Sequence, residues 1–256
     1  MAKTALAAQL YTLRNFTQTL PDIARTFQRL RQLGYEAVQL SALGVWDVPE
    51  LARILTDSGL ECASTHLGWD RFANDLDRLI DEHRALGCKH PAIGGMPQPY
   101  HSAEGIVRFA REAEAVGKKL APAGMDFSYH NHNFELTRAG KKTWLDLLYE
   151  NSDGRYLKAE IDTYWIQAGG GDPAAWIAKV AGRMPVLHLK DMVYGPDGKV
   201  RMAEIGEGNL NWTAILAAAK RAGVQWYCIE QDECYERDPF DSLKLSLDNL
   251  HAMGMK

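Results

Sequence analysis

Apolar residues along this chain follow two kinds of spacing. In segments such as 20–33 they recur at helical intervals, as Ile23, Phe27 and Leu30 do, which predicts an amphipathic helix. Short apolar runs without strict alternation follow such segments, as expected for strands that are covered on both faces. Five glycines stand between the two kinds of segment, where a helix needs a left-handed stop before a strand: Gly34, Gly59, Gly87, Gly124 and Gly223.

This pattern predicts eight strands that alternate with eight helices. The predicted strands cover residues 5–11, 36–40, 61–66, 90–94, 126–131, 156–162, 185–190 and 225–230. The predicted helices cover residues 20–33, 48–58, 72–86, 103–121, 143–150, 173–181, 212–222 and 239–252. Because 256 residues leave no room for a second domain, we predict one α/β domain over residues 1–256, a (β/α)8 TIM barrel. A doubly wound open sheet is the alternative, and the turn signal at 194–199 predicts a hairpin after the seventh strand.

Composition and charge narrow the classes of partner. The formal net charge is -4 and basic runs are short, which excludes the electrostatic footprint of a nucleic-acid binder. No apolar run approaches the roughly 20 residues of a membrane span, and the N-terminus lacks an export signal, so we expect a cytoplasmic protein without membrane contact. The four cysteines lack paired spacing and are expected to be reduced, buried thiols.

Ionisable residues gather at the predicted carboxyl ends of the strands, where barrel enzymes build their active sites. Residues two apart on a strand share a face, so these side chains are directed at one central space. The segments are Ser64-Thr65-His66, His130-Asn131-His132, Glu160-Ile161-Asp162, His188-Leu189-Lys190-Asp191 and Glu230-Gln231-Asp232.

A divalent metal ion would offset the cost of burying these groups together. Imidazole and carboxylate ligands suit manganese, cobalt, iron or zinc. We predict a ligand from each of strands 5 to 8, namely His130, Asp162, His188 and Glu230. Two alternatives stay open, because a single strand-end histidine is more often a hydrogen-bonded core residue and Lys190 and Asp191 can form a structural ion pair.

Aromatic residues near the same strand ends offer flat apolar faces to a sugar, although ordinary packing explains them equally well. They form two groups, Trp46 with Trp69 and Tyr164 with Trp165. The segment Ile205-Gly206-Glu207-Gly208 either brings backbone amides or Glu207 near a substrate or is a plain turn.

Several phrases together resemble one family. They are Tyr129-His130-Asn131-His132-Asn133-Phe134-Glu135, Asp162-Thr163-Tyr164-Trp165, His188-Leu189-Lys190-Asp191, Ile205-Gly206-Glu207-Gly208 and Ile229-Glu230-Gln231-Asp232. Their order over nearly the whole chain resembles the sugar phosphate isomerase/epimerase group of the xylose isomerase-like TIM barrels. The same superfamily includes AP endonucleases, but the acidic charge and Trp165, where those enzymes have a metal-binding histidine, oppose DNA repair.

The resemblance implies one divalent ion, most often manganese. It would be held by a Glu on strand 5, an Asp on strand 6, a His or Gln on strand 7 and a Glu on strand 8. Asp162, His188 and Glu230 match these positions, whereas His130 stands where the family often has glutamate. Family epimerases use the strand-5 and strand-8 glutamates as opposed acid and base, so only Glu230 keeps that role here. We also expect substrate contacts from His66, Gln39, Trp69, Trp165 and Glu207.

The expected chemistry is proton abstraction beside a metal-polarised carbonyl of a ketose or keto-sugar. Glu230 is the expected base, His132 or Glu160 returns the proton, and Lys190 stabilises the developing oxyanion. Reprotonation makes the protein an isomerase or epimerase, whereas loss of a β-substituent makes it a lyase or dehydratase acting on a keto-inositol or 3-keto-glycoside. A sugar-binding barrel without catalysis is a third hypothesis, and a homo-oligomer is compatible with each of them.

Overall fold

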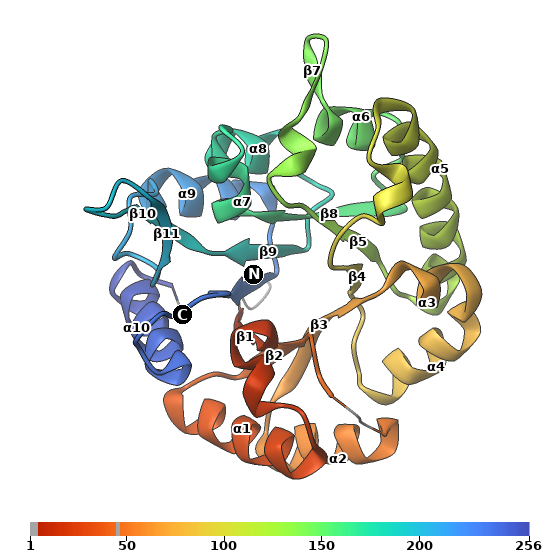
Figure 1. Ribbon diagram of the computed structural model, residues 1–256. Helices are drawn as coiled ribbons and strands as arrows, with labels where there is room; N and C mark the ends of the chain where they lie inside the picture. Colours follow the sequence, from red (N-terminus) through yellow and green to blue (C-terminus); the bar gives the residue numbers. More distant parts are fainter. Residues whose placement is uncertain (1–4, 45–46, 256) are drawn as a thin grey trace.

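Eight parallel strands close into a barrel in the computed structural model, which describes residues 5–44 and 47–255 (Figure 1). Around the barrel their order is β1-β12-β9-β8-β5-β4-β3-β2, and β2 pairs with β1 to close it. This is the predicted (β/α)8 TIM barrel, so the alternative of an open sheet is wrong. The barrel strands are β1 (Ala5–Gln9), β2 (Ala37–Leu40), β3 (Glu61–Leu67), β4 (Pro91–Ile93), β5 (Phe127–His130), β8 (Leu157–Asp162), β9 (Val186–Leu189) and β12 (Trp226–Ile229).

Helices surround the barrel on its outside (Figure 1). The α-helices are α1 (Leu20–Leu33), α2 (Val48–Ser58), α3 (Trp69–Asn74), α4 (Leu76–Ala85), α5 (Ala103–Leu120), α6 (Trp144–Glu150), α7 (Thr163–Ala168), α8 (Pro173–Lys179), α9 (Trp212–Ala222) and α10 (Pro239–Ala252). Short 3-10 turns are η1 (Leu10–Phe16), η2 (Gln98–Tyr100), η3 (Ala121–Ala123) and η4 (Phe134–Leu136). Among the described residues, no helix is long and apolar enough to cross a membrane.

Several local features differ from the prediction. The helix predicted over 72–86 is two helices, α3 and α4, because Asp75 lies between them with φ of -139° and ψ of 37°, outside the helical region. The first strand ends at Gln9, whose side chain accepts the Tyr11 backbone N–H and starts η1. Helix α7 was not predicted, and it begins directly after β8 because the Asp162 carboxylate accepts the Trp165 N–H.

The predicted glycine stops are confirmed. All five have left-handed backbone angles, with φ between 65° and 108°. At Gly34 and Gly223 the glycine N–H donates to a carbonyl in the last turn of the helix, and the chain then enters the next strand. A side chain at φ of 108° would be strained, so Gly34 in particular fixes the exit from α1.

The barrel interior is built in two layers. Apolar and mostly small side chains from β1, β2, β3, β9 and β12 pack together in the lower layer: Ala7, Ala37, Ala63, Val186 and Cys228. Two residues further along four of these strands, on the same faces, are Gln9, Gln39, His188 and Glu230. The polar layer therefore lies on the apolar layer and nearer the carboxyl ends of the strands, where barrel active sites are built.

Asp191 anchors the segment that follows β9. This segment forms a two-stranded hairpin, β10 (Asp191–Tyr194) with β11 (Val200–Ala203), which confirms the predicted hairpin. The buried Asp191 carboxylate accepts the backbone N–H groups of Gly206, Gly208 and Leu210 and the indole N–H of Trp212, at 2.6 to 3.2 Å. The segment from 205 to 208 is thus a turn tied to Asp191. A second hairpin pairs β6 (Arg138–Ala139) with β7 (Lys142–Thr143).

The contacts of Asp191 predict a large effect of Asp191→Asn on stability. We expect the free energy of unfolding to fall by about 3 kcal/mol, because buried N–H groups lose a charged acceptor that one amide oxygen cannot replace. Urea denaturation measures this change. Asp197→Asn is the matched control, since the contacts of exposed Asp197 among the described residues are with Arg201 and nearby hairpin groups. Its unfolding midpoint should stay at the wild-type value. Equal shifts for both variants would contradict the anchoring role.

Candidate metal centre and pocket

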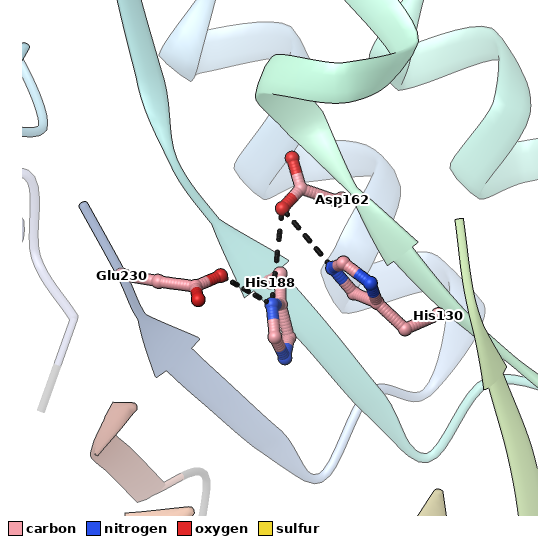
Figure 2. Close-up of side chains that lie close together, drawn as sticks. All are labelled: His130, Asp162, His188 and Glu230. Carbon is pink, nitrogen blue, oxygen red and sulfur yellow. Dashed lines mark hydrogen bonds and ion pairs between the residues drawn. The ribbon is translucent and has the colours of Figure 1, made fainter. Parts of the chain in front are cut away.

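Four side chains converge inside the carboxyl end of the barrel (Figure 2). They are His130 from β5, Asp162 from β8, His188 from β9 and Glu230, which directly follows β12. Their ligand atoms all lie within 4.8 Å of one another, and all four side chains are buried. Asp162 Oδ2 lies 3.2 Å from His130 Nε2 and 3.8 Å from His188 Nδ1, and Glu230 Oε2 lies 2.9 Å from His188 Nδ1.

The strand register brings these residues together. Strands β5, β8, β9 and β12 are neighbours in the barrel, and Asp162 lies directly opposite His188 in the pairing of β8 with β9. Cys228 also lies opposite His188, so Glu230 stands two residues further along β12 and faces the same space. One residue from each of four consecutive strands therefore reaches a common point.

Surrounding contacts fix two of the four side chains. One oxygen of Asp162, Oδ1, accepts the Trp165 N–H at 2.9 Å at the start of α7, which leaves Oδ2 directed at the cluster. His130 places Nδ1 3.3 Å from the carbonyl of Gly94 and directs Nε2 at Asp162. The donors are therefore oriented before any ligand arrives.

Lys190 places a buried ammonium group in the site. Its Nζ lies 2.9 Å from Glu230 Oε2, 2.8 Å from Asp232 Oδ1 and 3.3 Å from Asp162 Oδ2, and its side chain is 1% exposed. Burial opposes the charged form, but the three carboxylates outweigh it and raise the pKa of Lys190. The alternative of a Lys190–Asp191 ion pair is wrong, because neighbouring side chains point in opposite directions and Asp191 faces the 205–208 turn.

The same charges act on the other groups. Burial opposes ionisation of Glu230, yet Lys190 and His188 hold its pKa well below the usual range. Burial also opposes the charge on His188, but Glu160 and Glu230 raise its pKa to about 10. Two groups nearer the pocket have pKa values shifted toward the neutral form. Burial and Glu230 raise the pKa of Asp232 to about 6. Burial and His130 lower the pKa of His132 to about 3. The carboxylates of the cluster are thus ionised beside the charged His188 and Lys190, and His132 next to them stays neutral.

The donors fit a divalent cation. Two imidazole nitrogens with oxygens from two carboxylates form the mixed donor set that suits manganese, iron, cobalt or zinc. Lys190 and His188 already supply positive charge to these carboxylates, so the donor set itself is what favours a metal ion. His130 and Glu230 also line the pocket above, so an ion bound here could contact a substrate.

A pocket of about 500 Å³ opens above the cluster. Gly94 and Gly95 line it and leave room for two imidazole rings. A Cβ at Gly94 would lie 3.1 Å from the His66 ring, and a Cβ at Gly95 would lie 3.3 Å from the His132 ring. The pocket residues that the sequence predicted as site residues are His66, His130, His132, Trp165, Lys190 and Glu230. Asp232 was expected at a strand end facing the same space but was given no role, and the sequence missed Gln9, Tyr11, Ser41, Leu67, Gly68, Gly94 and Gly95. The rule used for ionisable residues does not detect these positions, although Gln9 ends β1 and the two glycines directly follow β4.

Other predicted site residues lie outside the pocket wall. Gln39 and Glu160 lie beneath the cluster, fully buried, and hydrogen-bond to each other at 2.7 Å. Trp69 packs against Phe109, with ring centroids 4.9 Å apart, and Glu207 accepts a hydrogen bond from Asn249. Trp46 lies outside the described residues. Direct substrate contacts by these residues stay predictions.

Comparisons with known proteins agree with this architecture. A curated inosose dehydratase of Geobacillus kaustophilus is 24% identical over 200 residues, which cover 66% of this chain and 61% of that enzyme. A solved sugar phosphate isomerase/epimerase from Parabacteroides distasonis is 21% identical, with a TM-score of 0.84 and coverage of 100% of this chain and 96% of that one. A structure of L-ribulose 3-epimerase is 18% identical, with a TM-score of 0.74 and coverage of 97% and 94%.

A family model confirms the resemblance that the sequence motifs indicated. The model described as "Xylose isomerase-like TIM barrel" matches residues 27–250, most of the chain. By this match, the chain belongs to the xylose isomerase-like TIM barrel family.

Proposed function

We propose that this protein is a metal-dependent isomerase or epimerase that moves a proton beside the carbonyl of a ketose or keto-sugar. The observation that carries the proposal is the convergence of two imidazoles, two carboxylates and the ammonium of Lys190 at the base of one pocket. Similar proteins include an epimerase acting on L-ribulose and an inosose dehydratase, whose names both imply such substrates.

In this proposal His130, Asp162, His188 and Glu230 hold the ion, manganese being the first candidate. A bound divalent ion supplies a Lewis acid that polarises a carbonyl oxygen and acidifies the neighbouring C–H bond. The chain itself supplies the surrounding charges. Lys190 lines the pocket, and its Nζ lies beside Glu230, so we assign it the stabilisation of negative charge on the substrate oxygen.

Proton transfer is assigned to two residues of the pocket wall. Glu230 is the proposed base, since its carboxylate is ionised and it lines the pocket. His132 is the proposed second proton carrier, because it lines the pocket and its buried Nδ1 has no hydrogen-bond partner among the described residues. Glu160 does not line the pocket, so we do not assign it a proton-transfer role.

Elimination is the second candidate reaction. It starts with the same proton abstraction but ends with loss of a β-substituent. The presence of His130 on β5 favours it, since a second glutamate opposite Glu230 is the arrangement that the family resemblance links to epimerisation. The similarity to an inosose dehydratase supports the same alternative.

Metal binding is the first test of the proposal. Isothermal titration of the chelator-treated protein should show one Mn²⁺ per chain. His130→Ala should weaken binding by more than the roughly 10–100-fold that loss of an outer contact costs, because it removes a donor. His132→Ala is the matched control, since this neighbouring imidazole lies outside the four donors. Absence of binding to the wild type, or equal losses in both variants, would reject the proposed ion site.

The reaction itself can be followed by NMR in deuterated water with L-ribulose, an inosose and a 3-keto-glycoside. Isomerisation or epimerisation predicts solvent deuterium at a stereocentre with every substituent retained. Release of water or an aglycone would instead establish the lyase alternative. If no substrate exchanges a proton with solvent while sugars still bind, the protein is a binding barrel without catalysis.

His132→Gln tests the proton-transfer role. We expect kcat to fall by about 10²–10⁴-fold, the usual contribution of a general acid or base, with Mn²⁺ affinity preserved because His132 is not one of the four donors. Steady-state kinetics and metal titration on the same preparation measure both quantities. An unchanged kcat would exclude His132 from the proton transfer.

A further inference from the structure

We infer that Glu160 is a positioning residue, which holds the His188 ring so that Nδ1 faces the cation site. This inference rests on the proposed metal binding and assigns a role to a residue beneath the pocket. Glu160 lies on β8, is fully buried, and does not line the pocket. Its contacts are with Gln39, His66 and His188, so we assign it a role through these neighbours.

The contacts of Glu160 are made by one carboxylate oxygen, Oε1. Three nitrogens surround Oε1, those of Gln39 Nε2 at 2.7 Å, His66 Nε2 at 2.7 Å and His188 Nε2 at 2.6 Å. These groups come from β2, β3 and β9, so the carboxylate ties strands from different sides of the barrel. The contact with His188 is an ion pair between fully buried side chains.

His188 lies between carboxylates on its two edges. Glu230 and Asp162 lie on the Nδ1 side, at 2.9 and 3.8 Å, together with the other donors of the cation site. Glu160 alone faces Nε2 among these carboxylates. With a cation bound among the donors on the Nδ1 side, Glu160 is the carboxylate that pairs with Nε2, so it holds the ring with Nδ1 toward the cation site.

Ring packing supports the same orientation. The His66 ring is stacked on the His188 ring, with centroids 5.1 Å apart and planes 12° apart, and His66 itself is held by Glu160. The Glu160 carboxylate thus fixes the His188 ring and also the His66 ring that is stacked on it.

A second metal ion among His66, Glu160 and His188 is the competing interpretation of these contacts. Both imidazole nitrogens lie 2.6 to 2.7 Å from the same oxygen, which is the length of a direct polar contact. Metal–ligand bonds of about 2.0–2.2 Å hold neighbouring ligand atoms roughly 3 Å apart or more. The distances therefore favour a positioning contact over a bridging ion.

Metal titration of Glu160→Gln, Glu160→Asp and Glu135→Gln tests the inference. Glu135→Gln is the matched control, because Glu135 is equally buried but bonds to Tyr129 and to the His132 backbone. We expect Glu160→Gln to weaken Mn²⁺ binding by about 10–100-fold, Glu160→Asp to recover much of the loss because it keeps the charge, and Glu135→Gln to bind as the wild type does. Circular dichroism of the metal-free variants confirms folding.

A spectroscopic measurement separates positioning from general loss of structure. In the Co²⁺-loaded wild type, the ring N–H of His188 should give a strongly shifted proton signal that disappears in deuterated water. Glu160→Gln should broaden or remove this signal through faster exchange, whereas Glu135→Gln should retain it.

The outcomes divide as follows. Equal Mn²⁺ affinity and an unchanged N–H signal in Glu160→Gln would overturn the inference, as would equal losses in Glu160→Gln and Glu135→Gln. Two ions per chain in the wild type, reduced to one in Glu160→Gln, would establish the bridging ion instead. A wild type that binds no metal would reject the proposed function itself, so the two failures are distinguishable.

Discussion

The structure depends on the charge balance around one buried histidine. His188 contacts Glu230 through one ring edge and Glu160 through the other, and neither the ring nor Glu160 reaches solvent. Lys190 supplies the neighbouring positive charge to Glu230 and Asp162. Removal of any one partner leaves an uncompensated charge in the barrel, so the centre is ordered as a unit.

The barrel places this cluster between an apolar layer on one side and a pocket on the other. An apolar floor that includes Ala7, Ala37 and Cys228 excludes water from below, while Gly94 and Gly95 leave space for imidazoles above. The ionisable groups of the cluster therefore face apolar side chains below and a pocket above. Such surroundings strengthen electrostatic effects on a bound substrate, because few water dipoles screen them.

Helix α7 shows how a functional residue can also define local structure. Asp162 uses Oδ1 to begin α7 and Oδ2 to face the cluster, so one side chain links the helix to the site. Trp165, on that short helix, thereby comes to the pocket wall next to His132, with ring centroids 5.3 Å apart. A change at Asp162 would affect both the site and the wall above it.

The sequence by itself determined the barrel, the approximate bounds of its elements and the four converging side chains. It could do so because glycine stops, apolar runs and strand-end ionisable residues such as His130 and Glu230 are local signals that the barrel topology then places at one end. The division of α3 from α4, the burial of Glu160 below the pocket and the partner of Asp191 were decided only by tertiary structure. Each depends on which distant group a side chain meets, as Glu160 meets His66 and His188 across the barrel, and no local pattern encodes that distance.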